Sequence, residues 1–213
     1  MTLNSWLEQL AQRWAQMSGW ELAAVVLAVA YLLLAVRQNR WCWAAAFVST
    51  AIFTLLFWHV QLVMQSALNG YYMAMAVYGW WHWQHGDGGD ETGGLPIHRW
   101  GAKHHAVALG VITACALASG YLLDRHSDAA WPYLDSFVTW AAVVTTFMVA
   151  RKVLDNWAYW MVINSLAIVL FVDRGMALTA LLHATYLVIS VFGWISWVRD
   201  YRRQPAETAV EPS

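Results

Sequence analysis

Residues 19–58 read GWELAAVVLAVAYLLLAVRQNRWCWAAAFVSTAIFTLLFW. The stretch holds two apolar runs, 19–36 and 41–58, separated by a short polar break that carries Arg37 and Arg40. A helix needs about 20 mostly apolar residues to cross the hydrocarbon core of a bilayer. Each run comes close to that length, so the stretch predicts two membrane-spanning helices joined by a tight turn.

The composition of the whole chain supports a membrane setting. Of its 213 residues, 12% are charged, 60% are hydrophobic and 16 are Trp, whereas soluble domains carry about 25% charged residues. This balance excludes a soluble enzyme and a disordered tail, and the net charge of -1 excludes a nucleic-acid binder. Both cysteines, Cys42 and Cys115, lie in apolar runs, which indicates packing rather than a disulfide or a metal site.

Charge-poor runs predict seven spans in all. They cover residues 19–36, 41–58, 62–83, 105–123, 133–150, 157–173 and 176–198. The last two runs would be too long for a single crossing if merged, so Asp173, Arg174 and Gly175 are interpreted as a turn.

The cations alternate between the two sides of these spans. Nine follow odd-numbered spans: Arg37, Arg40, Arg99, Lys103, Arg151, Lys152, Arg199, Arg202 and Arg203. Three lie on the other side: Arg13, Arg125 and Arg174. Because cytoplasmic loops are enriched in Lys and Arg, this split predicts an outside N-terminus and a cytoplasmic C-terminus.

The segments outside the spans have their own character. Residues 1–18 place apolar side chains on one helical face, which predicts an interfacial amphipathic helix rather than a signal peptide. Residues 84–132 are expected to form a glycine-rich cytoplasmic linker and a connector helix. Residues 199–213 are expected to form a cytoplasmic tail.

An offset of 114 residues relates the first three spans to the last three. It pairs Arg37 with Arg151, Trp43 with Trp157, Tyr72 with Tyr186, Gly79 with Gly193, Trp80 with Trp194, and Trp83 with Trp197. The offset predicts parallel repeats, 19–83 and 133–198, around a single connecting span, an arrangement known among small transporters. The alternative is that two tryptophan-rich interface belts simply resemble each other.

Polar and aromatic side chains inside the spans mark a candidate binding site. Trp157, Trp160 and Asn164 share one helical face at spacings of three and seven residues. Indole faces attract cations and amides orient hydrogen bonds, so this face suits a flat, cationic or heteroaromatic ligand. The other candidate contacts are Asn69, Tyr72, His183, Tyr186 and Asp135.

Each candidate also has a structural interpretation. Trp80, Trp81, Trp83, Trp194 and Trp197 fall at span ends, where anchoring in the membrane interface is expected. Asn69 and Asn164 could join helices through hydrogen bonds, and His183 could be a packing partner. Asp135 follows Pro132 at a helix start, where a helix-end role is open.

The motif Trp157-x-x-Trp160-x-x-x-Asn164, after Asp155-Asn156, resembles the PnuC family of bacterial vitamin transporters. Two further segments carry the resemblance, Tyr78-Gly79-Trp80-x-x-Trp83 and Trp131-Pro-Tyr-Leu-Asp135-Ser136, and it covers most of residues 20–200.

The resemblance implies an all-α membrane protein with three helices, a linker helix and three more helices, similar to the SWEET sugar transporters. It implies uptake of nicotinamide riboside across the bacterial inner membrane by facilitated diffusion, with a cytoplasmic kinase trapping the substrate, and a homotrimer. Close relatives carry thiamine, riboflavin or deoxynucleosides. Trp157, Trp160 and Asn164 would line the central site.

This chain departs from the family pattern at two positions. Nicotinamide riboside carriers often place Gln where this chain has Asn69, and Asn where it has Ala76. The substrate is therefore left open between nicotinamide riboside and thiamine, which both carry a positive heteroaromatic ring.

Other classes of membrane protein fit less well. A haem protein needs paired mid-span histidines, and only His183 is deep. A retinal receptor needs a buried lysine, but both lysines fall in loops. An intramembrane hydrolase would need a nucleophile for His183. The sequence thus predicts a carrier without enzymatic activity or cofactor, and the alternative of another class is a structural membrane scaffold.

Overall fold

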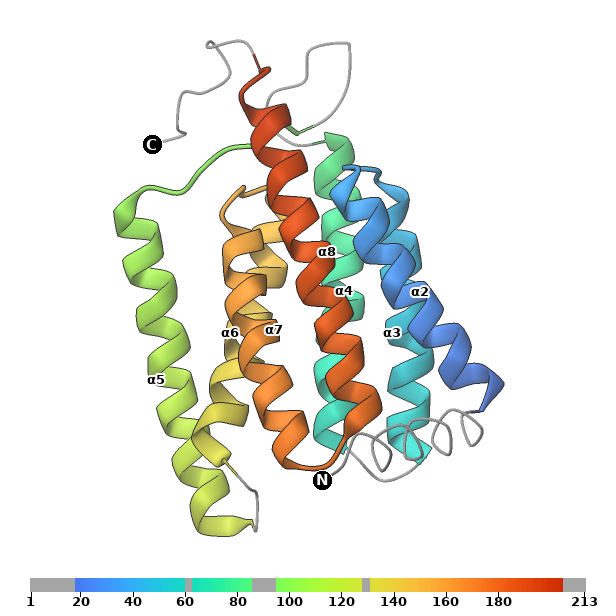
Figure 1. Ribbon diagram of the computed structural model, residues 1–213, viewed down its shortest axis with the longest axis vertical. Coiled ribbons are helices and arrows are strands. Elements are labelled where there is room, and N and C mark those ends of the chain that lie inside the picture. The colour runs from blue at the N-terminus through green and yellow to red at the C-terminus, as the bar shows by residue number, and fades with distance from the viewer. Residues whose placement is uncertain (1–17, 60–62, 86–94, 128–130, 205–213) are drawn as a thin grey trace. The chain divides into compact units, whose positions relative to one another are not determined.

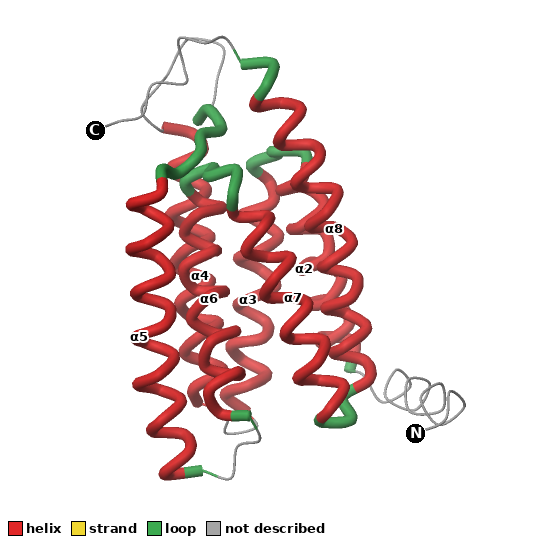
Figure 2. Tube along the Cα trace, turned by 60° about the vertical axis from the view of Figure 1, so that its left-hand side comes forward, coloured by secondary structure: helices red, strands yellow, loops and turns green. Residues whose placement is uncertain are grey.

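The computed structural model describes residues 18–59, 63–85, 95–127 and 131–204, and in these ranges the chain forms seven helices (Figure 1). They are α2 (Gly19–Val36), α3 (Trp41–His59), α4 (Val63–His85), α5 (Ala102–His126), α6 (Pro132–Ala150), α7 (Asn156–Asp173) and α8 (Ala177–Tyr201). Each of the seven predicted spans corresponds to one helix, so the all-helical prediction is confirmed. Figure 2 shows the described elements as helices and loops. The amphipathic helix expected over 1–18 lies outside the described residues except for Ser18.

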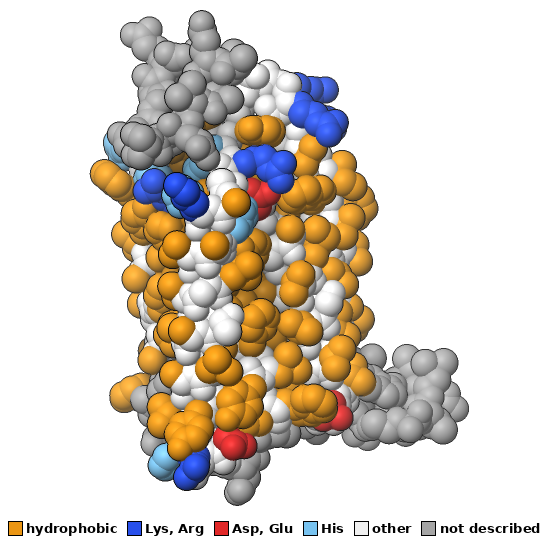
Figure 3. All heavy atoms as spheres, turned by 90° about the vertical axis from the view of Figure 1, so that its left-hand side faces the viewer, with side chains coloured by type: hydrophobic (Ala, Val, Ile, Leu, Met, Phe, Trp, Pro, Cys, Tyr) orange, Lys and Arg blue, Asp and Glu red, His pale blue; other side chains and the backbone are white. Residues whose placement is uncertain are grey.

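Six of the described helices, all but α4, are long and apolar enough to cross a membrane. In α4, Ser66, Asn69 and Gly70 lower the mean hydropathy of an otherwise long helix. In the view from the side of α5, hydrophobic side chains cover the flank of the helix, as a lipid-facing surface requires (Figure 3).

Local signals in the sequence explain where several helices begin and end. Ser18 caps α2 in a capping box, in which its hydroxyl accepts from the Glu21 amide (3.2 Å) and the Glu21 carboxylate accepts from the Ser18 amide (2.8 Å). Gly175 adopts a left-handed φ of 67° between α7 and α8, which confirms the predicted turn. Gln38 and Lys152, 114 residues apart, adopt left-handed φ values of 52° and 53° after α2 and α6.

The chain divides into two compact units, which are described separately. The tryptophan unit takes in residues 18–99, 146–157 and those from 189 onward. The connector unit takes in residues 100–145 and 158–188. The boundaries between the units fall near or within α6, α7 and α8, so each of these helices contributes to both units.

In the tryptophan unit, α2, α3 and α4 lie side by side (Figure 1), and four buried indoles from α3, α4, α7 and α8 contact one another. Trp43 packs edge-on against Trp83 (5.5 Å, 87°), Trp157 packs edge-on against Trp197 (5.5 Å, 83°), and Trp83 lies 6.3 Å from Trp197. We call these four residues the tryptophan cluster. Edge-to-face packing places the positive edge of one ring on the negative face of the next.

Trp83 and Trp197, two members of the tryptophan cluster that are 114 residues apart, make equivalent hydrogen bonds. The Trp83 indole donates to the carbonyl oxygens of Val149 (3.3 Å) and Ala150 (3.1 Å), and the Trp197 indole donates to that of Ala35 (3.0 Å). Ala35 and Val149 are themselves 114 residues apart. The Ala35 and Val149 carbonyls also accept from the amides of Gln38 and Lys152 (3.0 Å each), so the indole is a second donor at the end of each helix, α2 or α6.

Interface anchoring was the expectation for these helix-end tryptophans, and it is wrong for Trp83 and Trp197. Their side chains are 4% and 0% exposed because each reaches a helix-end carbonyl inside the protein. Trp81 is 56% exposed, as an anchor should be.

We expect Trp83→Phe and Trp197→Phe to lower stability by similar amounts, about 1–2 kcal/mol each, because each removes a buried indole hydrogen bond and leaves a small gap where the larger ring was. Thermal unfolding of the purified protein in detergent measures the loss. Trp81→Phe, on the same helix as Trp83 but exposed, is the control and should change little. A strong effect in only one of the two buried variants would contradict the equivalence of the two contacts.

The segment before α5 is hydrogen-bonded to the turn between α6 and α7. The His98 amide donates to the Lys152 carbonyl (3.3 Å), and the Leu154 amide donates to the His98 carbonyl (2.8 Å). Arg99 donates to buried Asp155 through Nε (3.1 Å) and Nη2 (2.7 Å), and this pairing raises the pKa of the arginine. Burial lowers the pKa of His98. The segment with His98 and Arg99, just before α5, therefore has a fixed position in this unit.

Lys152 is unusual because it is buried in that same turn. Its residue exposure is 7%, and its Nζ lies 4.9 Å from the centre of the Trp83 ring. Burial lowers its pKa from 10.5 to about 8. The indole face partly offsets the loss of hydration of the ammonium group.

We expect Lys152→Gln to raise stability at about pH 7 by about 1–2 kcal/mol, because Gln avoids burying a charge and already adopts this φ at position 38. The folded pKa of about 8 lies below the unfolded value of 10.5. Wild-type stability should therefore rise with pH between these values, and the advantage of the variant should shrink there. Melting temperatures measured across this window test the prediction. A gain that is constant with pH would contradict a charge effect.

In the connector unit, α5 packs against α6 through small and aromatic residues. A Cβ added at Gly120 would meet the Tyr133 ring at 2.6 Å, so only glycine permits this approach. The Trp140 indole donates to the Ser119 hydroxyl (3.1 Å). Ile112, Ala141, Ala142 and Ile163 form the buried apolar centre of this unit.

Candidate functional site

A buried amide and an imidazole meet in the connector unit. Asn164 on α7 is 2% exposed, and its Oδ1 lies 2.9 Å from His183 Nδ1 on α8. The Asn164 Nδ2 donates to the Trp160 carbonyl one turn earlier (2.8 Å), which fixes the orientation of the amide. Because Oδ1 can only accept, His183 Nδ1 must carry the hydrogen, and Nε2 of the neutral ring is then an acceptor.

Aromatic rings surround the imidazole. Phe171 stacks on His183 (5.2 Å, 21°), and Tyr186 meets it edge-on (5.7 Å, 74°). Trp160 packs with Tyr159 against the apolar centre of the unit. The amide–imidazole site is defined here as Trp160, Asn164, Phe171, His183 and Tyr186.

The structure thus brings together the side chains of three residues predicted from the sequence, Asn164, His183 and Tyr186, and the fourth, Trp160, meets Asn164 through its backbone carbonyl. Phe171 was missed because an aromatic residue in an apolar run carries no signal of its own. Its spacing of seven from Asn164, which places both on one helical face, is the one sequence feature that could have identified it.

The remaining predicted contacts have other surroundings. Trp157 belongs to the tryptophan cluster, where it is 1% exposed and lies against Gly193. Asn69 and Tyr72 lie on α4 in the tryptophan unit, and the Tyr72 ring lies 5.5 Å from that of Tyr71. Their role as substrate contacts stays a prediction.

Asp135 lies in the first turn of α6, in the connector unit. Its carboxylate pairs with Arg174 in the turn after α7 (3.9 Å). Nearby in sequence, the Trp131 indole donates to Asp173 (2.7 Å). These contacts fit a helix-end role, one of the two interpretations left open by the sequence.

The groups of the amide–imidazole site are suited to hydrogen bonding and ring stacking. Neutral donors and acceptors held beside aromatic faces suit a flat polar ring, whose hydrogen-bonding groups they can orient. Among the residues that the structure describes, no three His, Cys, Asp or Glu side chains are grouped as a metal ion would require.

Comparisons with known proteins identify the family. The sequence model of the nicotinamide mononucleotide transporter family matches residues 18–199. The riboflavin/roseoflavin transporter RibM of Streptomyces davaonensis is 23% identical over 194 residues, which cover 89% of this chain and 87% of that protein. The nicotinamide riboside transporter PnuC of Escherichia coli is 22% identical over 181 residues, 74% of this chain and 75% of that protein.

A solved structure supports the same fold. The crystal structure of the vitamin B3 transporter PnuC matches with a TM-score of 0.69 at 18% identity, and covers 95% of this chain and 91% of that chain. The resemblance to the PnuC family found in the sequence is thereby confirmed. The family match runs from the start of α2 almost to the end of α8 and so includes all seven described helices. The chain is a multi-pass protein of the bacterial inner membrane and belongs to the nicotinamide mononucleotide transporter family.

Proposed function

We propose that this chain takes up nicotinamide riboside by facilitated diffusion and contacts it through the amide–imidazole site. The observation that carries the proposal is the partly buried hydrogen bond between Asn164 and His183, which has aromatic rings on either side of the imidazole. A polar pair within membrane-spanning helices is costly unless it serves binding or packing.

The chemistry of nicotinamide riboside matches these groups. Its pyridinium ring is flat and positively charged, and aromatic faces attract such a ring by about 2 kcal/mol or more when both are desolvated. Its carboxamide and ribose hydroxyls are donors that could bond to His183 Nε2. Asn69, Tyr72, Trp157 and Asp135 remain proposed contributors.

We further propose alternating access by two parallel repeats around one connecting helix. The matched contacts at a spacing of 114 residues support this arrangement, because Trp83 and Trp197 make the same kind of bond to helix ends 114 residues apart. The cation distribution supports a cytoplasmic C-terminus and an outside N-terminus. Trapping by a cytoplasmic kinase and assembly as a homotrimer are proposed from the family resemblance.

Riboflavin is the second candidate substrate. The similarity to RibM spans more of this chain than the similarity to the Escherichia coli PnuC does. The departures at Asn69 and Ala76 also weaken the match to nicotinamide riboside carriers. Thiamine carries a positively charged ring, as nicotinamide riboside does, and is the third candidate substrate.

Calorimetry on the purified protein with nicotinamide riboside, thiamine, riboflavin and a deoxynucleoside separates these candidates. We expect nicotinamide riboside to bind, and its reduced, uncharged form to bind at least about tenfold more weakly, since that form loses the cation attraction. Binding of riboflavin alone would replace the proposed substrate. No binding by any compound, together with no uptake into vesicles, would favour a scaffold.

A further inference from the structure

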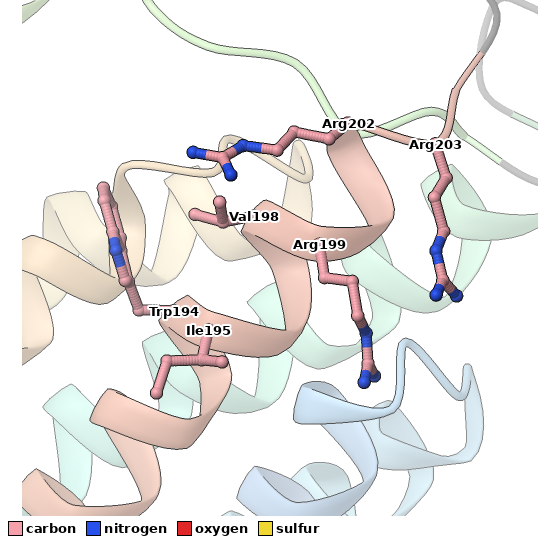
Figure 4. Close-up of a pocket in the computed structure, with 6 residues that line it drawn as sticks. All are labelled: Trp194, Ile195, Val198, Arg199, Arg202 and Arg203. Carbon is pink, nitrogen blue, oxygen red and sulfur yellow. The ribbon is translucent and has the colours of Figure 1, made fainter.

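A groove with a basic end lies along the last turns of α8, in the tryptophan unit. It has a volume of about 440 Å³ and is lined by Trp194, Ile195, Val198, Arg199, Arg202 and Arg203 (Figure 4). The lining forms two adjacent rows at spacings of four residues, Trp194–Val198–Arg202 and Ile195–Arg199–Arg203. In both rows the apolar residues come first and arginine comes last.

The helix geometry fixes the cationic end of this groove. The Arg202 amide donates to the Val198 carbonyl (3.1 Å), and the Arg203 amide donates to that of Asp200 (3.0 Å), so the helical path continues past Tyr201. In Figure 4, the Arg202 side chain extends over Val198 on the side of Trp194, while Arg199 and Arg203 extend from the other side.

The positive charge of the groove exceeds what its surroundings neutralise. Arg202 and Arg203 are exposed, and neither forms an ion pair within the described part of the chain. Arg199 lies 3.8 Å from Asp200, whose other carboxylate oxygen accepts from Gln38 (2.9 Å). Among the described residues, the one carboxylate paired with these three arginines is thus Asp200, which lies beside Arg199 and is shared with Gln38.

The position of the groove selects its ligand. Because α8 is apolar enough to span the membrane, its arginine-bearing end reaches the depth of the lipid headgroups. Ile195 is 57% exposed and lies one turn deeper, where acyl chains would cover it. We propose that this groove binds an anionic phospholipid, with its phosphate between the arginines and its acyl chain along Trp194, Ile195 and Val198. A free phosphate would satisfy the arginines but leave the apolar half uncovered.

Native mass spectrometry of the full chain in detergent tests the proposal, with phosphatidylglycerol and phosphatidylcholine of identical acyl chains as probes. We expect phosphatidylglycerol to be retained preferentially. Arg202→Gln and Arg203→Gln should each weaken its binding about fivefold, without changing that of phosphatidylcholine. Both residues are exposed, and unchanged melting temperatures will confirm that the variants fold. Arg125→Gln, which removes an exposed arginine at the end of α5, is the matched control and should have no effect.

Three outcomes would overturn the proposal. The first is equal retention of the two lipids by the wild type. The second is an equal loss in Arg125→Gln, which would indicate a general charge effect. The third is displacement of phosphatidylglycerol by millimolar inorganic phosphate in the wild type but not in Arg202→Gln, which would identify a site for the free anion. None of these readouts depends on which vitamin is transported.

Discussion

Asn164→Ala should weaken substrate binding by about 100-fold or more while the protein still folds. The change removes one amide from the amide–imidazole site and leaves the partly buried Nδ1–H of His183 without its acceptor. A 100-fold loss corresponds to about 2.7 kcal/mol of binding free energy, which we expect when Asn164 no longer holds the His183 ring in the orientation and tautomer that present Nε2 as an acceptor. Calorimetry with nicotinamide riboside, or with whichever vitamin of the panel binds, measures the effect.

Ser165→Ala is the matched control for this prediction. Ser165 is the next residue on α7, is exposed, and bonds only to the Met161 carbonyl of its own helix among the contacts described (2.8 Å). Its loss should leave affinity unchanged. Trp160→Ala should also weaken binding, because its ring lies one turn from Asn164 on the same face of α7. Wild-type affinity in both site variants would reject the site.

Gly79→Ala and Gly193→Ala should each destabilise the protein by about 3 kcal/mol or more, because overpacking a rigid core is costly. A Cβ at Gly79 would overlap the Trp43 ring, and a Cβ at Gly193 would lie 2.5 Å from the Trp157 ring. Both indoles are buried and pack against another ring of the tryptophan cluster, so they have little room to move aside. Thermal unfolding and the yield of folded protein in detergent measure the loss.

Gly70→Ala controls for the effect of the added methyl group itself. Gly70 lies on α4 with Gly79, and nothing lies within 4 Å of a Cβ added there. It should be neutral or slightly stabilising, since alanine is the better helix former. Trp43→Leu should partly rescue Gly79→Ala and not Gly193→Ala, because only the first clash involves that ring. If Trp43→Leu rescued both glycine variants, the Gly79–Trp43 and Gly193–Trp157 contacts would not be independent.

The helices were predictable because apolar length is a strong signal. The predicted span 41–58 corresponds to α3 (Trp41–His59), and the predicted span 133–150 corresponds to α6 (Pro132–Ala150). The turn between α7 and α8 was also predictable, because Asp173, Arg174 and Gly175 interrupt two apolar runs and glycine readily adopts a left-handed φ. The side of the membrane on which each end lies rests on cation counts alone and stays a prediction.

The site was predictable only in part, because periodicity shows which residues share a helical face and not what each one meets. Trp157, Trp160 and Asn164 share a face of α7, yet Trp157 meets Gly193 and Trp197 while Asn164 meets His183. Phe171 enters the site through its packing on His183, a contact between two helices that no local pattern encodes. The burial of Trp83 and Trp197 depends likewise on carbonyl groups distant in sequence.

The tryptophan cluster also has an optical consequence. Indoles 5.5–6.3 Å apart, two pairs of them nearly perpendicular, are close enough for their electronic transitions to couple. Such coupling gives a paired signal in near-ultraviolet circular dichroism, whose size depends steeply on ring separation and angle. Because two of these rings come from α3 and α4 and two from α7 and α8, any shift between those helix ends would change the signal. The protein therefore carries its own unlabelled probe of motion during transport.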